Sequence, residues 1–191
     1  MYNIFDITIK WEVIGIEFLI VWIICLILSI KPWIKIKIIK NSFCKRNYDK
    51  SLKMIKKLKN SRYDYRGLVK EYTLKNEMII HCLLNNREMF ENASNEYGKE
   101  KNFSEFCHIL FYLVNDSQNE ELEKLITDYK GEYGKTIRFK YLDILIKIKN
   151  HELESAKADY HLIRKKIKNK ILKQYLTECL KKEEETNIKK F

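Results

Sequence analysis

One apolar stretch, residues 13–30, constrains the fold of the whole chain. Its 18 residues include a single charged side chain, that of Glu17. A helix of this length spans roughly 27 Å, close to the ~30 Å hydrocarbon core of a bilayer. A helix in the core of a soluble domain needs a polar stripe, and residues 18–30 hold no polar side chain beyond Ser29. The sequence therefore predicts a transmembrane helix over residues 13–30.

The flanks of this stretch favour a retained anchor over a cleaved signal peptide. Trp11 and Trp33 bracket it, roughly 33 Å apart along a helix, as expected of aromatic side chains at the two membrane interfaces. The following LSIKPW segment lacks the small residues of a signal-peptidase site. We expect a single-pass membrane protein. Glu17 is compatible with a contact inside the membrane or with a side chain that reaches the outer interface.

The basic residues predict the orientation of the anchor. The first twelve residues hold only Lys10, whereas the other flank is rich in lysine. The positive-inside rule then places the N-terminal segment outside and residues 31–191 in the cytoplasm. The five cysteines show no CxxC pair, as in a reducing compartment. We expect anionic headgroups to contact Trp33 and the basic residues of 31–46, which are Lys31, Lys35, Lys37, Lys40, Lys45 and Arg46.

The composition of the remaining chain predicts an all-α fold. Five glycines and one proline leave little material for loops. Apolar residues recur at three- and four-residue spacings. The spacings and polar breaks predict helices over 47–60, 64–84, 87–97, 103–115, 119–130, 135–149, 151–168 and 170–184.

The predicted helices also repeat. NEELEKLITDY (119–129) and NHELESAKADY (150–160) are identical at six of eleven positions, and a period near 31 to 38 residues is typical of stacked helix pairs. LESAKADYHLI places Leu153, Ala156, Tyr160 and Ile163 in a pattern of large and small residues. YDKSLKMIKKL places Tyr48, Ser51, Ile55 and Leu58 in the same pattern.

This pattern resembles the second helix of the tetratricopeptide-repeat superfamily, over roughly residues 47–168. The resemblance implies a stack of antiparallel helix pairs, an α-solenoid, in which the small residue permits close helix contact. The first helices lack the Trp and Leu-Gly positions of that family, and an irregular helical bundle is the alternative. We expect a short extracytoplasmic segment (1–12), the transmembrane helix (13–30), a basic juxtamembrane segment (31–46), the helical-repeat domain (47–184) and a tail (185–191).

Motifs for catalysis and cofactor binding are missing from the sequence. The glycines are scattered, so a phosphate-binding loop is excluded, and neither GxSxG nor HExxH occurs. The pairs His81-Cys82 and Cys107-His108 have one member that faces away on a helix, which disfavours a metal site. We expect a protein that is not an enzyme and that holds no cofactor.

Two basic groups are candidate binding residues. The first helices of stacked pairs line a concave surface, and there the residues outside the apolar stripes are Lys70, Lys75, His81, Arg138, Lys140 and Lys147. Their charge predicts an acidic peptide or helix as ligand, although such residues are also ordinary solvated positions. The second group is a basic run that we expect on an amphipathic terminal helix, with lipid contact as an option: Arg164, Lys165, Lys166 and Lys168.

The function that fits these features best is a membrane-anchored scaffold or adaptor that binds another protein. The first alternative is a membrane-anchored immunity protein that neutralises a toxin or bacteriocin. The second is a tethered regulator that binds lipid or nucleic acid. The net charge of +11 is compatible with all three, but nucleic acid is the least favoured partner because no nucleic-acid-binding motif occurs.

Overall fold

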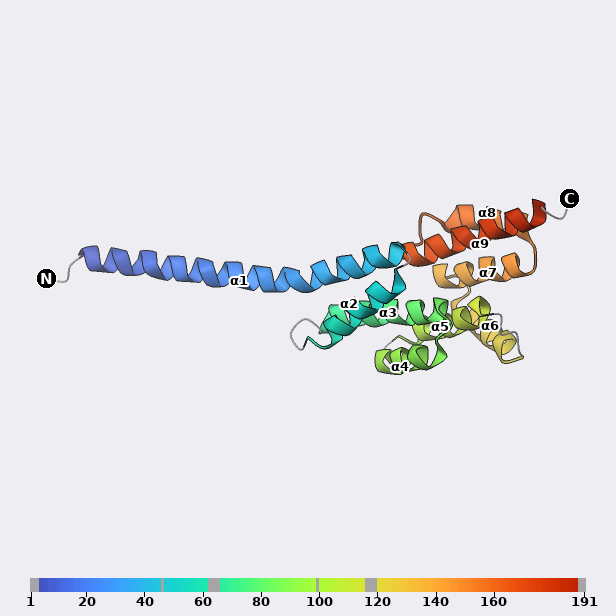
Figure 1. Cartoon of the computed structure of the whole chain (residues 1–191), viewed down its shortest axis with the longest axis horizontal. Helices are drawn as coiled ribbons and strands as arrows, with labels where there is room; N and C mark the ends of the chain where they lie inside the picture. Colours follow the sequence, from blue (N-terminus) through green and yellow to red (C-terminus); the bar gives the residue numbers. More distant parts are fainter. Residues whose placement is uncertain (1–3, 46, 62–65, 99, 116–119, 189–191) are drawn as a thin grey trace.

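A computed structural model describes residues 4–45, 47–61, 66–98, 100–115 and 120–188, with side chains from Ile16 to Thr186. All regular structure in these ranges is α-helical (Figure 1). This confirms the all-α prediction. The helices are α1 (Ile4–Cys44), α2 (Tyr48–Lys59), α3 (Gly67–Leu83), α4 (Arg87–Tyr97), α5 (Lys101–Val114), α6 (Glu120–Tyr133), α7 (Ile137–Lys149), α8 (Leu153–Ile163) and α9 (Lys170–Ile188).

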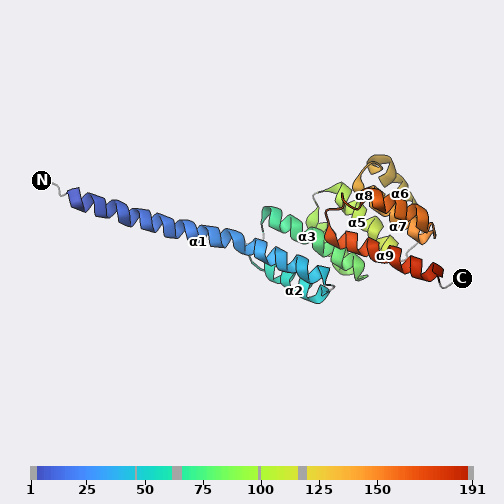
Figure 2. The same cartoon turned by 90° about the horizontal axis from the view of Figure 1, so that it is seen from above.

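The first helix, α1, projects from the domain as a long rod (Figures 1 and 2). Every side chain of residues 16–31 is exposed. Within Ile16–Cys44 the helix is long and apolar enough to cross a membrane, as expected for residues 13–30. Figure 1 shows a shallow bend along α1, and Pro32 inside the helix explains it, because proline removes one backbone hydrogen bond.

The C-terminal part of α1 belongs to the domain core. Pro32, Ile36, Ile39 and Phe43 are buried, and their spacings of four, three and four residues place them on one face of the helix. We expected a basic segment over 31–46 and a domain that begins at residue 47. The structure differs, because the domain starts within α1 and a cut at residue 47 removes part of the core.

The second helix, α2, packs on this buried face of α1. Ser51, Ile55 and Leu58 are its buried residues. The Ser51 hydroxyl donates a hydrogen bond to the carbonyl of Ile39 at 3.2 Å. A side chain as small as serine permits this close approach of the two helices. The Asn47 side chain caps α2 by accepting a hydrogen bond from the backbone N–H of Lys50 at 3.0 Å.

Helices α3, α5 and α7 form a central row, and the other helices cover it. α3 contacts α4 and α5, α5 contacts α6 and α7, and α7 contacts α8 and α9. The last helix, α9, also contacts α1. In an open solenoid each repeat contacts only its neighbours. The contact between α1 and α9 therefore closes the domain in a way that the predicted stack did not include.

Most predicted helix bounds differ from the observed ones by a few residues, with three larger errors. Helix α6 continues through Gly131 to Tyr133, where we placed a break. Helix α8 ends at Ile163, so the basic run 164–168 is a turn and a short coil instead of helix. Ile163 and Ile167 are both buried, and their four-residue spacing is the one expected within a helix, so the apolar pattern of the sequence did not reveal the break. Helix α9 runs to Ile188 through most of the predicted tail.

The buried small residue of α8 provides a test of helix packing. Ala156 is fully buried, and replacement by leucine forces the neighbouring helices apart. We expect Ala156→Leu to lower the free energy of unfolding by about 1–3 kcal/mol, measured by chemical denaturation of the full chain in detergent. Ala158 on the same helix is exposed, so Ala158→Leu should change it by less than about 0.5 kcal/mol. Equal effects of the two variants would contradict the described packing.

Candidate functional site

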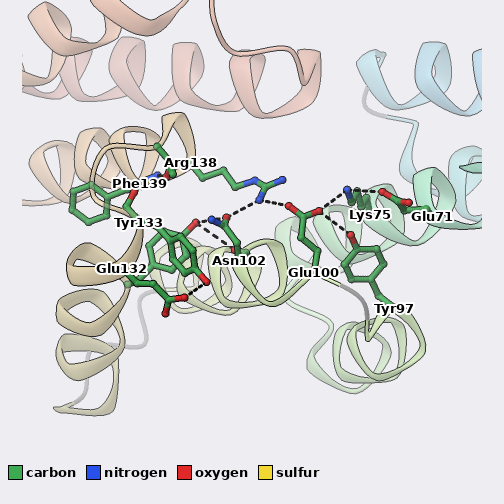
Figure 3. A network of polar contacts seen from close by, with 11 residues as sticks. Glu71, Lys75, Tyr97, Glu100, Asn102, Glu132, Tyr133, Arg138 and Phe139 are labelled. Atoms are coloured by element: carbon green, nitrogen blue, oxygen red, sulfur yellow. Dashed lines mark hydrogen bonds and ion pairs between the residues drawn. The ribbon is translucent and has the colours of Figure 1, made fainter.

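A network of charged side chains joins four helices around Glu100, which precedes α5 (Figure 3). Lys75 of α3 lies 2.8 Å from one carboxylate oxygen of Glu100, and Arg138 of α7 lies 2.5 Å from the other. The Tyr97 hydroxyl, at the end of α4, donates a hydrogen bond to Glu100 at 3.1 Å. Lys75 also pairs with Glu71 at 2.8 Å. One carboxylate therefore holds together helices that are far apart in the sequence.

The two cations of the network also flank an aromatic ring. Lys75 Nζ and Arg138 Cζ each lie 5.2 Å from the centroid of the Phe103 ring. A cation over a ring face is attracted by its quadrupole. Phe103 is buried, so the ring forms an apolar floor beneath the charged groups.

Glu100 and Lys75 both remain charged near neutral pH. Partial burial opposes the charge of Glu100, but the hydrogen bonds and charges of Lys75 and Arg138 outweigh it and lower its pKa to about 2. Burial likewise opposes the charge of Lys75, and its hydrogen bonds with Glu100 and Glu71 outweigh that effect and raise its pKa. These shifts stabilise ion pairs and leave neither group poised to exchange a proton at pH 7.

Asn102 extends the network toward α6. Its side-chain oxygen accepts hydrogen bonds from Arg138 at 2.6 Å and from the Tyr129 hydroxyl at 3.0 Å. The sequence NFSE, which begins at Asn102, has the spacing of a capping box, but α5 starts one residue earlier. Its N-cap, Glu100, makes no capping bond because its side chain turns to Lys75 and Arg138.

The residues predicted to line a concave basic surface are mostly neutralised within the domain. Lys75 and Arg138 come together at Glu100, as described. Lys70 lies 3.5 Å from Glu96, and Lys147 pairs with Asp143 and Asp159. Lys140 is exposed. The structure thus unites only Lys75 and Arg138 in one site.

His81, predicted as a partner contact, is buried and lies out of reach of a partner. Its side chain is 3% exposed, and neither ring nitrogen has a hydrogen-bond partner within the described ranges. Burial lowers its pKa, and the nearby charge of Lys59 adds to this effect. The prediction failed because the helical pattern of α3 does not reveal that this helix is covered on several sides.

A central groove lies beside the network, between α5, α7 and the start of α9. Its volume is about 370 Å³. Apolar side chains form its floor, and Arg138, Lys166 and Lys168 stand at its rim. The Tyr141 hydroxyl donates a hydrogen bond to the carbonyl of Leu172 at 2.9 Å and ties α7 to α9. The apolar lining comprises Phe103, Phe106, Ile137, Tyr141, Ile167 and Leu172.

The predicted lipid contacts lie in two places. Arg164 and Lys165 are exposed on the turn after α8, whereas Lys166 and Lys168 belong to the central groove. On α1 the predicted interface residues Lys31, Trp33 and Lys37 are exposed, and Lys35 and Lys40 are half-buried. Arg46 and the side chain of Trp11 lie outside the described residues.

Comparison of the chain with protein-family models, with curated proteins and with solved structures gave no match. The geometry of the chain is therefore the basis for its site. Among the described residues, no group of three or more His, Cys, Asp or Glu side chains is placed to hold a metal ion. Sequence reasoning predicted Lys75 and Arg138 of this network but missed Glu100, Asn102, Phe103 and Tyr141. The capping-box spacing of NFSE at Asn102 is a signal in the sequence that marks this region.

The network predicts a pH-dependent contribution to stability. Glu100→Gln removes the charge that pairs with Lys75 and Arg138, and we expect a loss of about 1 kcal/mol of unfolding free energy at pH 7, since the site is partly exposed. The folded-state pKa of Glu100 is lowered, so its contribution is present above about 4.5 and is lost as the pH falls toward 2. The difference between wild type and variant should therefore shrink between pH 5 and pH 2 in denaturation experiments.

Glu91 provides the control for this variant. It pairs with Arg87 at 3.9 Å on an exposed face, and Glu91→Gln should change stability by less than about 0.5 kcal/mol. A loss in Glu100→Gln that is the same at pH 7 and pH 2.5 would contradict the electrostatic origin.

Burial of His81 predicts destabilisation on the acid side of neutrality. Its pKa is lowered from 6.5 in the folded state, so the unfolded chain binds the proton first and stability falls as the pH drops below about 6.5. We expect His81→Leu, which removes this proton, to weaken the pH dependence of the unfolding free energy between pH 7.5 and 5. The pH dependence that remains in the variant includes the contribution of His108, whose pKa is also lowered by burial. An unchanged slope in the variant would show that His81 is accessible in the folded protein.

Proposed function

We propose that this protein is a non-enzymatic, single-pass membrane protein whose cytoplasmic helical domain holds a partner protein at the membrane. The observation that carries partner binding is the central groove, with an apolar floor and a basic rim. The proposed anchor is residues 13–30, and the distribution of lysines around it supports a cytoplasmic position of the domain.

The exposure of α1 supports the membrane anchor. Residues 16–31 are apolar apart from Glu17, Ser29 and Lys31, and all are exposed. An uncovered apolar surface of this length is stable in a bilayer and prone to aggregation in water. The same helix continues into the core through Ile36 and Ile39, so its apolar part is joined to the domain without a linker.

The small residues of the repeats support a tetratricopeptide-like arrangement of the helix pairs. Ser51 and Ala156 occupy the small-residue position of the two quoted repeats, and both are fully buried. We propose that the pairs α3–α4, α5–α6 and α7–α8 form a short stack, closed by α9 against α1.

The groove favours an acidic segment with bulky apolar side chains as its ligand. Its volume of about 370 Å³ is at the lower end of the ~300–1,000 Å³ of ligand sites, which suits a few side chains. Arg138 is already paired with Glu100. Lys166 and Lys168 are exposed, and no ion pair of either occurs within the part of the chain that the structure describes. Complementary charge at these two lysines would fix the register of a bound segment.

Site-directed crosslinking in native membranes tests this function. A photoreactive side chain introduced by Ile137→p-benzoylphenylalanine lies in the groove. We expect it to form an adduct with one protein through an acidic segment. Reversal of the rim by Lys166→Glu with Lys168→Glu should lower the yield at least ~tenfold, because two attractive charges become repulsive.

Two exposed lysines of α6 provide the matched control. Lys124→Glu with Lys130→Glu makes the same change in net charge away from the groove and should leave the adduct intact. If the adduct survives rim reversal, or if its contact segment lacks acidic residues, the groove is not the binding site. If the captured partner is a toxin, the groove mechanism holds and the function is immunity.

A further inference from the structure

The structure brings a second basic surface close to the membrane, on the α1–α2 hairpin. The Ser51–Ile39 hydrogen bond fixes α2 against α1. From Ser51, α2 extends roughly 12 Å to Lys59, and from Ile39, α1 extends roughly 13 Å back to Ile30. Figures 1 and 2 both show α2 running back along α1 toward its apolar half. The end of α2 therefore returns most of the way to the level at which α1 leaves the bilayer.

The outer face of α2 is strongly basic. Lys53, Lys56 and Lys57 are exposed and lie opposite the buried face formed by Ser51, Ile55 and Leu58. Lys59 turns inward and pairs with two carboxylates, those of Glu77 and Glu96. The only acidic residue of α2 is Asp49, in its first turn and thus at the end far from the membrane. Cations accordingly accumulate on the membrane-facing half of this helix.

An exposed apolar side chain lies at the start of α3, the helix that follows α2. Leu68, in the first turn of α3, is 71% exposed, and Arg66 before it is exposed as well. Gly67, where α3 begins, is eight residues from Lys59, where α2 ends, so the two helix ends lie within roughly 29 Å of each other. A large apolar side chain flanked by cations is typical of surfaces that rest on a lipid interface.

We propose that Lys53, Lys56 and Lys57 of α2, with Arg66 and Leu68 at the start of α3, form a surface that docks on anionic phospholipid headgroups of the leaflet from which α1 emerges. The lysines contact phosphates, and Leu68 reaches the boundary of the acyl region. The headgroup layer extends about 5–8 Å beyond the hydrocarbon core, within reach of lysine side chains at this level. The inference rests on the membrane anchor proposed above.

Docking of this surface fixes the orientation of the domain. A single helix that leaves a bilayer permits tilt and rotation of whatever it carries. A second contact, beside the helix, removes most of that freedom. The central groove then faces a constant direction relative to the membrane, and its partner binds at a defined height above the leaflet.

Photocrosslinking of the full chain in nanodiscs tests the proposal. Leu68→p-benzoylphenylalanine should form adducts with phosphatidylglycerol in nanodiscs of phosphatidylcholine mixed with phosphatidylglycerol. In nanodiscs of phosphatidylcholine alone, we expect at least ~fivefold less adduct, the effect of about one lysine near an anionic surface. Leu162, which is 73% exposed on α8, is the matched control, and the same substitution there should give no lipid adduct.

Reversing the charge of the α2 lysines tests whether these lysines hold position 68 at the lipid headgroups or whether position 68 lies near lipid without their contribution. The triple variant Lys53→Glu, Lys56→Glu and Lys57→Glu should lower the lipid adduct at position 68 at least ~fivefold. The control triple Lys124→Glu, Lys130→Glu and Lys135→Glu changes the net charge equally at exposed positions and should leave it unchanged. The proposal is overturned if the yield at position 68 is the same in both lipid mixtures or survives reversal of the α2 lysines.

One further position distinguishes failure of this inference from failure of the anchor. Ile27→p-benzoylphenylalanine, in the exposed apolar part of α1, should crosslink to lipid acyl chains irrespective of headgroup charge. Crosslinking at position 27 without crosslinking at position 68 means that the protein spans the membrane while its domain stands away from the leaflet. Lack of lipid adducts at position 27 overturns the membrane anchor itself.

Discussion

The packing of α1 on α2 is the contact on which the rest of the structure depends. One face of α1, from Pro32 to Phe43, is buried in the domain, while the part before it is exposed on all sides. A single helix therefore combines an exposed apolar part with a part that is buried in the protein interior, and in the proposed membrane protein the exposed part lies in lipid. Because no flexible linker separates the two parts, the direction of α1 determines where the domain lies relative to the exposed part of the helix. The proposed lipid-docking surface on α2 and the start of α3 follows from this position.

Several acidic side chains pair with cations of other helices within the domain. Glu77, Glu96 and Glu100 each pair with a lysine or arginine of another helix. Such partly buried pairs join helices that also share the apolar core, and they stabilise a specific arrangement more than they add net stability. Lys53, Lys56 and Lys57 on the outer face of α2 and Lys166 and Lys168 at the groove rim are exposed, and no ion pair of these five lysines occurs among the described residues. Both proposed binding surfaces thus carry positive charge.

The sequence by itself determined the features that arise from local periodicity. The apolar run without a polar stripe predicted a long helix outside the domain core. A helix that is apolar on every side lacks the polar face by which a helix of a small soluble domain contacts water. Scarce glycine and proline predicted the all-α fold, and apolar spacings located most helices to within a few residues. Burial of the repeat positions Ser51 and Ala156 also agrees with the periodic pattern, because small side chains at these positions mark close helix contacts.

Only the tertiary structure decided which charges face each other and which helices lie inside. Glu100 meets Lys75 and Arg138 across 25 and 38 residues of sequence, a juxtaposition that no helical period encodes. His81 is buried because α3 is covered by several neighbours, whereas an amphipathic pattern describes one buried face. The domain boundary at residue 47 differs from the structure for the same reason. Residues 31–46 are rich in lysine, and the buried residues among them, such as Ile36 and Ile39, form only a narrow stripe on one face of the helix. Local pattern specifies the helices, and long-range packing selects which of their surfaces remain available for binding.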